Sequence, residues 1–297
     1  MQKYYTFMIE NRFNYEELFN QMVSFTKDYI TKCKLHSAIL GISGGIDSTV
    51  VAALLYEVTK KIHEDNNGYV FEFYGYTLPT DTTNEKEFLV STFVGYAFAT
   101  CFEKHNITNI AKNISDECKV IGPYSAFRNG NIKSRFRMIY LYDKAKENNG
   151  FVVGTDNYTE KLLGFSTIGG DALADYMPLQ YLWKTEVYGL AKYLLEKYKN
   201  EENWKAVNAL NESINLTPQD GLGISTSDMD QIGANNYYDV DEILYTYENL
   251  GVKYDTFILS KEYGVLCEKF TRDVVIKVLN RRVNNFKLNL PLEFKIK

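Results

Sequence analysis

The fold is decided by the stretch Gly41-Ile42-Ser43-Gly44-Gly45-Ile46-Asp47-Ser48, which joins a short apolar run to a stretch of helical periodicity. Residues 37–43, SAILGIS, predict a buried strand, and STVVAALLYEVTKKIHE from Ser48 onward has apolar residues at helical spacing. Two adjacent glycines let the backbone approach an anion closely, and the following helix N-terminus presents unpaired N–H groups and a positive dipole end. We therefore expect a phosphate-binding loop at residues 41–48.

The loop is not a Walker A motif, because it has no GK[ST] ending and no lysine inside the turn. It resembles the SGGxDS pyrophosphate loop of the ATP pyrophosphatase (PP-loop) superfamily, whose members split ATP between the α and β phosphates. The resemblance implies that Asp47 holds Mg²⁺ on the β and γ phosphates, since a hard cation prefers a carboxylate together with phosphate oxygens. The structural alternative is a Gly-Gly turn in which Asp47 and Ser48 only cap the helix.

Strands and helices alternate around this loop. Further strands are predicted at residues 69–79, near residue 107 in NITNIAKNI, and in FVVGT at 151–155. Helical patterns run through NEKEFLVSTFVGYAFATCF from Asn84 and through a long segment from Ser125. Such alternation predicts βαβ units, and therefore an α/β fold with a doubly wound parallel sheet and flanking helices.

The rest of the chain is predicted to be mainly helical after residue 184, with a final helix through Arg281 and Arg282. We expect one domain over residues 1–297. It would comprise an N-terminal helical segment (about 1–36), a nucleotide-binding α/β core (37–185) and a helical C-terminal part with a lid loop (186–297). Loops at 79–87 and 213–226, rich in Thr, Asp and Gly, are candidate lids.

Composition narrows the class of protein. Hydrophobic residues make up 45% and charged residues 24%, as in ordinary globular proteins. The net charge of -5 argues against a general nucleic-acid binder. The N-terminus lacks the apolar run of a signal peptide, and no apolar stretch approaches the roughly 18 residues of a membrane span, so we expect a cytoplasmic protein. The four cysteines form no CxxC pair, which excludes zinc-ribbon and dithiol redox sites.

A second motif specifies the reaction. Residues 154–185, GTDNYTEKLLGFSTIGGDALADYMPLQYLWKT, are similar to the NAD synthetase pattern GTxxxxExxxGxxTxxGDxxxDxxPxxxxxKT without a gap. Upstream, GNIKSRFRM at 130–138 resembles the GNxKxRxRM helix of the same family. Downstream, SINL from Ser213 and TPQDGLGISTSDMD after it resemble a further loop of that family. The resemblance covers nearly all of residues 37–232.

The family indicated by these motifs is that of the ammonia-dependent NAD synthetases, with an adenine nucleotide alpha hydrolase-like fold. The resemblance implies a ligase that uses ATP and Mg²⁺ to amidate deamido-NAD with ammonia through an acyl adenylate, releasing AMP and pyrophosphate. It also implies a homodimer with the dinucleotide site near the interface. No segment looks like an attached glutaminase domain, so free ammonia is the expected nitrogen source.

The resemblance also implies roles for individual residues. Asp47 and Glu160 would hold the metal, and Lys184 would stabilise charge on the triphosphate. The expected ATP-binding residues are Gly41, Ile42, Ser43, Gly44, Gly45, Ile46, Asp47, Ser48, Thr155, Lys184 and Ser213. The expected deamido-NAD-binding residues are Arg135, Ile168, Asp175, Phe286 and Lys287. The structural alternatives are surface or helix-end positions for Glu160, Lys184 and Ser213, and a solvated basic helix face for Arg135.

The chain departs from the family pattern at the dinucleotide site. Ile168 stands where many bacterial members have the lysine of GFFTK, and GDGGxD becomes Gly170-Asp171-Ala172-Leu173-Ala174-Asp175. Phe286-Lys287 replaces a frequent His-Lys pair. These changes remove one expected cationic contact to the dinucleotide and replace an imidazole ring by the phenyl ring of Phe286.

Two other functions are compatible with the loop alone. One is a tRNA-modifying enzyme or other adenylating amidotransferase with a PP-loop, which the acidic balance and the lack of paired cysteines disfavour. The other is a non-catalytic nucleotide-binding module, which would have no need of Asp47 and Glu160. Pyrophosphate release that depends on deamido-NAD would indicate the synthetase, and release that depends on tRNA would indicate the tRNA-modifying enzyme. Binding of AMP without turnover would indicate the non-catalytic module.

Overall fold

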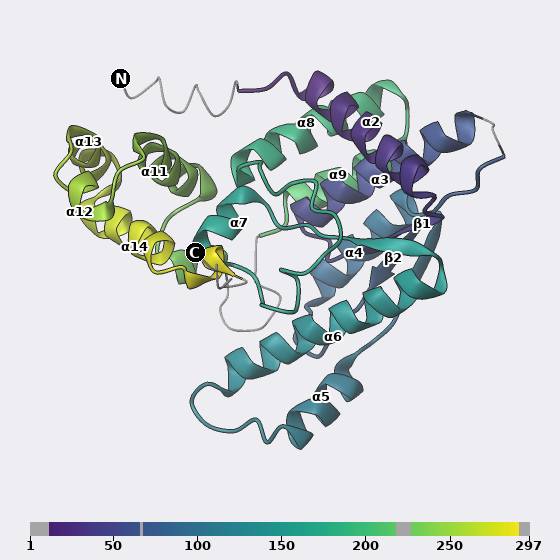
Figure 1. Ribbon diagram of the computed structural model, residues 1–297, viewed down its shortest axis with the longest axis horizontal. Helices are drawn as coiled ribbons and strands as arrows, with labels where there is room; N and C mark the ends of the chain where they lie inside the picture. The colour runs from purple at the N-terminus through teal and green to yellow at the C-terminus, as the bar shows by residue number, and fades with distance from the viewer. Residues whose placement is uncertain (1–11, 66–67, 218–226, 291–297) are drawn as a thin grey trace, which may run out of the picture.

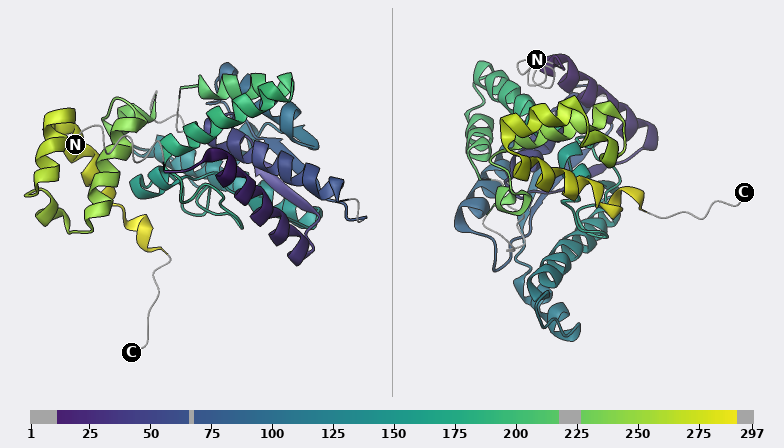
Figure 2. Two further views of the ribbon diagram at one scale, coloured as in Figure 1. Left: turned by 90° about the horizontal axis from the view of Figure 1, so that it is seen from above. Right: turned by 90° about the vertical axis from the view of Figure 1, so that its left-hand side faces the viewer.

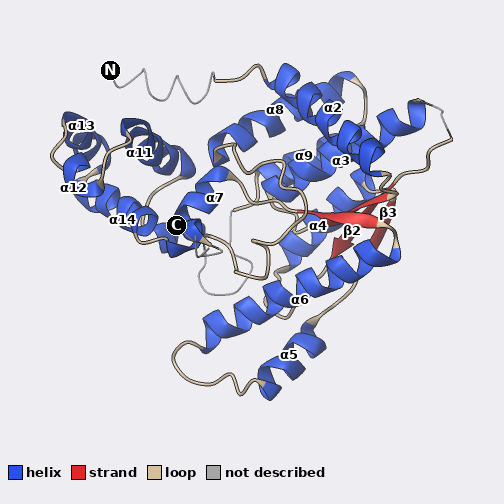
Figure 3. Cartoon of the chain, in the orientation of Figure 1, coloured by secondary structure: helices blue, strands red, loops and turns tan. Residues whose placement is uncertain are grey.

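A four-stranded parallel sheet forms the centre of the computed structural model, which describes residues 12–65, 68–217 and 227–290 (Figures 1 and 3). The strand order is β3-β2-β1-β4, with β1 at Ser37–Gly41, β2 at Glu72–Thr77, β3 at Cys101–Lys104 and β4 at Gly150–Val153. The chain adds β2 and β3 on one side of β1 and then returns to the other side with β4. The order therefore reverses between β1 and β4, where α/β sheets bind ligands beyond the carboxyl ends of their strands.

Helices cover both faces of the sheet (Figures 1 and 2). On one face α6 lies against β1 and β4, and α5 lies beside α6. On the opposite face α3 lies against the strands and α2, α8 and α9 surround α3, with α4 against β2 and β3. The bounds are α2 Tyr15–Cys33, α3 Ile46–Glu64, α4 Glu85–Phe98, α5 Thr108–Glu117, α6 Ser125–Glu147, α8 Lys184–Asn200 and α9 Trp204–Ile214.

The two faces of β1 supply two different cores, because side chains alternate along a strand. Ala38 and Leu40 belong to the larger core shared with α2, α3, α4, α8 and α9. Ile39 faces α6 and belongs to a smaller cluster with Met138 and Leu141. A strand buried on both faces reads as a continuous apolar run, which is the pattern that predicted β1.

A third core holds the helical C-terminal part. It is built from the apolar sides of α11 and α14 and includes Leu162 and Leu163 of α7 together with Trp183. The C-terminal helices therefore pack on the segment that connects β4 to α8, immediately beside the switch point of the sheet. The bounds are α7 Tyr158–Leu163, α10 Asp228–Ile232, α11 Tyr237–Leu250, α12 Tyr254–Phe257, α13 Lys261–Phe270, α14 Arg272–Val283 and a 3₁₀ helix at Phe286–Asn289.

The sheet, its parallel pairing and the helical C-terminal part confirm the predicted fold class. One predicted strand was wrong: NITNIAKNI near residue 107 contains the start of α5, and the third strand is β3, just before it. The segment has the spacing of a helix, because Ile107 and Ala111 are buried together while Ile110 is exposed, and Asn106 Oδ1 accepts a hydrogen bond from Thr108 N. Cys101, which the sequence placed in the preceding helix, begins β3.

Of the two candidate lids, the one predicted at 79–87 is described and is a loop only as far as Asn84, because α4 begins at Glu85. Residues 218–226 of the other lie outside the described residues. None of the helices in the described part of the chain combines the length and the apolar character that crossing a membrane requires.

Candidate active site

The phosphate loop turns sharply from β1 into α3. Gly44 has a φ of +88°, and a Cβ there would lie 2.7 Å from the backbone N of Ser91 on α4, so both the conformation and the space require glycine. The Ser43 hydroxyl accepts a hydrogen bond from Gly45 N at 3.2 Å and lies 3.1 Å from the Ser48 hydroxyl. The first turn of α3 begins directly after this, so its N–H groups point out of the sheet edge.

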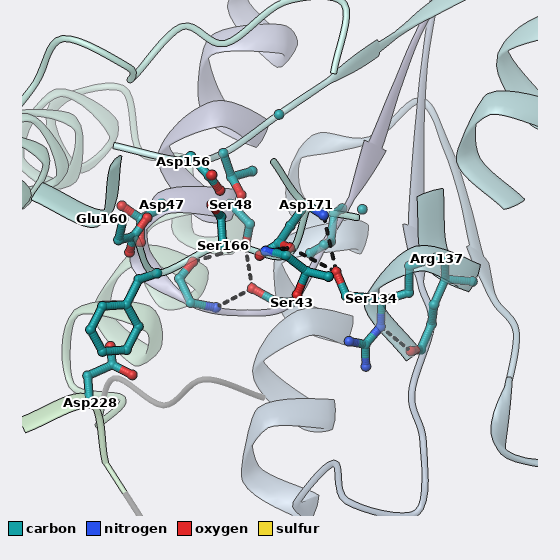
Figure 4. A pocket seen from close by; sticks show the side chains of 18 of the residues that line it. Ser43, Asp47, Ser48, Ser134, Arg137, Asp156, Glu160, Ser166, Asp171 and Asp228 are labelled. Atoms are coloured by element: carbon teal, nitrogen blue, oxygen red, sulfur yellow. Dashed lines mark hydrogen bonds between the residues drawn. The ribbon is translucent and has the colours of Figure 1, made fainter. Parts of the chain in front are cut away.

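The main pocket of the described structure lies at this edge (Figure 4). The phosphate loop lines it together with Tyr76–Pro79 at the end of β2, Gly154–Asp156 after β4 and part of α6. Figure 4 shows Asp47, Glu160 and Asp156 gathered on one side of the pocket and Arg137 on the other. A ligand in the pocket therefore meets a carboxylate side, a glycine-rich backbone and a guanidinium.

The carboxylate side is organised around one lysine. Lys184, the first residue of α8, has a side chain only 4% exposed, and its Nζ donates to Asp47 Oδ2 and, at 2.9 Å, to Glu160 Oε1. Asn157, fully buried, binds the other oxygens: its Nδ2 donates to Asp47 Oδ1 at 2.8 Å and its backbone N to Glu160 Oε2 at 3.3 Å. Each carboxylate thus has one oxygen on Asn157 and one on Lys184.

Asn157 also starts α7. Its Oδ1 accepts a hydrogen bond from Glu160 N, which completes a capping box with the Glu160 carboxylate. The first turn of α7 therefore fixes the Glu160 backbone, and the same asparagine fixes Asp47 on α3. This arrangement brings together residues 110 positions apart in the sequence.

Burial and like charges shift the acidity of this cluster. Burial, followed by the neighbouring Asp47 charge, raises the pKa of Glu160 to about 7 against the opposing effect of Lys184. Burial, followed by the charges of Asp171, Glu160 and Asp47, raises the pKa of Asp156 well above its usual value. For Lys184, burial lowers the pKa, but Asp47 and Glu160 outweigh it and hold the pKa well above its usual value. The three carboxyl groups of Asp47, Asp156 and Glu160 therefore lie close to a single ammonium, that of Lys184.

The start of α8 is held by buried polar contacts. Lys184 N donates to the Thr159 hydroxyl at 2.9 Å, and Asp241 accepts from both that hydroxyl and Thr185 N. Glu186 is fully buried, and its Oε2 accepts from Trp183 N at 2.9 Å. Its Oε1 has no hydrogen-bond partner among the described residues and lies 3.6 Å from Arg12. Burial raises the pKa of Glu186 to about 7.

Glu186→Gln is expected to remove a pH-dependent loss of stability. A carboxyl whose pKa rises from 4.5 to about 7 on folding favours the folded state fully below pH 4.5 and loses that contribution as pH rises toward 7. Between pH 4.5 and 8, the unfolding free energy of the variant should therefore gain about 3 kcal/mol on that of the wild type. Urea unfolding at several pH values measures this gain. Glu196→Gln, on the exposed side of α8, should show none.

Most of the residues predicted to bind ATP or the metal line this one pocket, and their contacts with ATP remain predictions. Asp47, Glu160, Lys184 and Thr155 line the pocket, as do Gly41, Ile42, Ser43, Gly45, Ile46 and Ser48. Gly44 and Ser213 do not line it. Ser213 is 1% exposed, and its hydroxyl donates to Gly44 O at 2.8 Å and lies 2.6 Å from the Thr49 hydroxyl. Ser213 therefore braces the phosphate loop from behind, and its contact with ATP stays a prediction.

Only one of the predicted deamido-NAD-binding residues, Lys287, lines the pocket. Its Nζ donates to the carbonyls of Gly164 and Ser166 and so ties the C-terminal segment to the loop after α7. The others, Arg135, Ile168, Asp175 and Phe286, lie outside the lining.

Those outer residues have structural contacts of their own. Arg135 Nε donates to Ile168 O at 3.0 Å, and the Ile168 side chain is 41% exposed. Asp175 accepts from Val152 N at 2.8 Å and from the Tyr142 hydroxyl at 3.3 Å, which fixes the edge strand β4. Phe286 is 62% exposed. Their contacts with the dinucleotide remain predictions.

Sequence reasoning missed Asn157, which holds both carboxylates, and two charged residues that line the pocket, Asp156 and Arg137. Asn157 carries a readable signal, because Asn followed three residues later by Glu has capping-box spacing. Asp156 had none, since it is a variable position of the matched pattern. Arg137, whose Nε donates to Leu78 O at 3.2 Å and whose pKa burial lowers, was grouped with the exposed basic face of its helix.

Comparisons with known proteins identify the family of this chain. The model of the NAD synthase family matches residues 18–291. The chain is 32% identical over 240 residues to the NH3-dependent NAD+ synthetase of Thermococcus sibiricus, covering 81% of this chain and 84% of that one. It is 30% identical over 295 residues to that of Fusobacterium nucleatum, covering 96% and 97%.

Solved structures show the same fold. An NMN synthetase from Francisella tularensis superimposes with a TM-score of 0.71 at 22% identity, covering 96% of this chain and 100% of that chain. An NH3-dependent NAD synthetase from Campylobacter jejuni, in complex with nitrate, does so with a TM-score of 0.67 at 22% identity, covering 95% and 100%.

Proposed function

Because this chain belongs to the NAD synthase family and catalyses the amidation of deamido-NAD to NAD with ammonia, we propose which of its residues carry that reaction. The observation that supports the assignment is the meeting of the phosphate loop, Asp47, Glu160 and Lys184 in one pocket at the switch point of the sheet. ATP places its triphosphate on residues 41–48 and against the N-terminus of α3. Pyrophosphate release that requires deamido-NAD tests this function.

The carboxylates fit a magnesium site. Asp47 Oδ2 and Glu160 Oε1 already converge on one cation, the Lys184 ammonium, so two oxygens are aimed at a common point. No group of three or more His, Cys, Asp or Glu in the described residues is arranged to hold a metal. Phosphate oxygens and water must therefore complete the coordination, as is usual for Mg²⁺. Bound there, Mg²⁺ would supply positive charge for the leaving pyrophosphate.

The chain's own residues position the reactants. The nicotinate carboxylate of deamido-NAD attacks the α phosphorus, the bond to the bridging oxygen breaks, and pyrophosphate leaves with its electron pair. Lys184 stabilises the charge that develops on the phosphates, and the phosphate loop holds them in line for attack. Ammonia then attacks the acyl carbon, loses a proton and displaces AMP. Adenylation supplies the leaving group, so no side chain acts as a covalent nucleophile.

Deamido-NAD is proposed to extend from the pocket toward Arg135 and Asp175. Exposed aromatic rings of α2 lie near Asp175: Phe25 is 64% exposed and Tyr29 36%, and their ring centroids lie 6.2 Å and 6.4 Å from that of Tyr176, the residue after Asp175. Aromatic faces of this kind can stack a nucleobase.

We infer that a second copy of the chain covers this region, in line with the homodimer that the resemblance implies. Sedimentation with and without deamido-NAD tests this: the ligand should strengthen the dimer, and a monomer at every protein concentration would contradict it.

Ile168→Lys is expected to tighten deamido-NAD binding. The Ile168 side chain is 41% exposed, so a lysine can occupy the position with little loss of apolar contact and add a cation near a polyanionic ligand. The gain should shrink at high salt, and turnover should change little. Titrations of both proteins with deamido-NAD at two ionic strengths measure this. Weaker binding together with a lower melting temperature would instead identify Ile168 as a packing residue.

A further inference from the structure

Lys184 lies where a metal ion would lie. Its Nζ contacts Asp47 Oδ2 and Glu160 Oε1, the two oxygens that face each other across the proposed magnesium site. The remaining two oxygens, Asp47 Oδ1 and Glu160 Oε2, are held by Asn157. The lysine ammonium therefore occupies the point at which the two carboxylates converge.

We propose that Lys184 is the internal counterion of the metal site and excludes Mg²⁺ from it until ATP arrives. This inference rests on the proposed function. The ammonium and the metal ion compete for the same two oxygens, so nucleotide-free protein binds Mg²⁺ weakly. The triphosphate then offers the ammonium a second anionic partner, and the metal enters as the lysine transfers to phosphate.

The surroundings of the carboxylates support this competition. Asn157 is fully buried and hydrogen-bonded to one oxygen of each carboxylate. These bonds keep the second oxygens, Asp47 Oδ2 and Glu160 Oε1, turned toward each other. Two converging carboxylates in a site of low dielectric repel each other unless a cation lies between them. The Lys184 ammonium already offsets the repulsion between the two carboxylates. A Mg²⁺ ion at the same point would be repelled by that ammonium.

The lysine also has room to transfer. Lys184 lines the pocket alongside Gly45 and Ser48 of the phosphate loop, so its ammonium and a bound triphosphate share one cavity. The centroid of the Tyr237 ring lies 5.1 Å from Nζ, so this ring packs against the ammonium. A transfer from carboxylate to phosphate therefore requires a change of side-chain torsion and no movement of α8.

The test is the affinity of nucleotide-free protein for Mg²⁺, measured by calorimetric titration of the metal alone. Lys184→Met should bind Mg²⁺ about tenfold or more tightly than the wild type, because the competing cation is gone. Lys287→Met is the matched control: it also removes a lysine charge from the pocket lining but leaves the Lys184 ammonium between the carboxylates. Its Mg²⁺ affinity should stay within about twofold of the wild type.

A second measurement guards against poor folding of the variant. Mg²⁺ should raise the melting temperature of Lys184→Met more than that of the wild type, because the unpaired carboxylates gain a cation. Adding Asp47→Asn to Lys184→Met should abolish the tight binding, which locates the metal on these oxygens.

Two results would overturn the inference. The first is unchanged or weaker Mg²⁺ binding by Lys184→Met, and the second is an equal gain in Lys287→Met, which would indicate a general charge effect of the pocket. Failure of the proposed function gives a different result, because pyrophosphate release by the wild type would then not require deamido-NAD, whatever the Mg²⁺ affinities.

Discussion

Asp47→Asn is expected to abolish pyrophosphate release while leaving the fold intact. The change removes the charge that would bind Mg²⁺, which is several kcal/mol of stabilisation for the leaving pyrophosphate, so we expect a loss on the order of 10³-fold. The amide keeps the size of the side chain and an oxygen for the hydrogen bond from Asn157 Nδ2. Initial rates of pyrophosphate release over a range of Mg²⁺ concentrations measure the effect, with melting curves to confirm folding.

The matched control is Asp143→Asn, which removes a carboxylate from the exposed side of α6 and should leave the rate unchanged. Glu160→Gln should reproduce the loss, because Glu160 provides the second oxygen of the site. Wild-type rates from Asp47→Asn at ordinary Mg²⁺ concentrations would show that the metal assignment is wrong.

Lys184→Met is expected to lower kcat by about 10²- to 10³-fold with little change in the KM for deamido-NAD. In the proposed mechanism the ammonium contacts phosphate oxygens whose charge grows as pyrophosphate leaves, so its contribution appears in the transition state. Steady-state rates with deamido-NAD and ATP varied separately give the two constants. A variant impaired only in its KM for the dinucleotide would contradict this role.

Sequence pattern predicted the fold well because the deciding features are local. The apolar run of β1, the Gly44-Gly45 turn and the periodicity of α3 each lie within a few residues. The third strand was misplaced because β3 has only four residues and none of them is fully buried, so it leaves no apolar run. The nearby apolar residues from Ile107 onward belong to a helix instead.

The motifs that line the pocket could be recognised from the sequence for the same reason, since each has a fixed spacing of residues. Contacts between segments that are distant in the sequence could not be recognised in this way. No local pattern reports that Asn157 reaches Asp47, that Ser213 lies behind Gly44, or that Lys287 binds the carbonyls of Gly164 and Ser166. Each of these depends on how α7, α9 and the C-terminal segment pack against the core. The residues predicted to bind the dinucleotide stay predictions, because Arg135, Ile168, Asp175 and Phe286 are exposed and lie outside the pocket lining.

The most direct test of the account follows an oxygen atom. Deamido-NAD labelled with ¹⁸O in both oxygens of its nicotinate carboxylate is incubated with the protein, ATP, Mg²⁺ and ammonium. The masses of the products are then determined by mass spectrometry. Attack of the carboxylate on the α phosphorus predicts NAD with one ¹⁸O in its amide and AMP with one ¹⁸O in its phosphate, while pyrophosphate stays unlabelled. Label in inorganic phosphate, with ADP as the other product, would contradict the account.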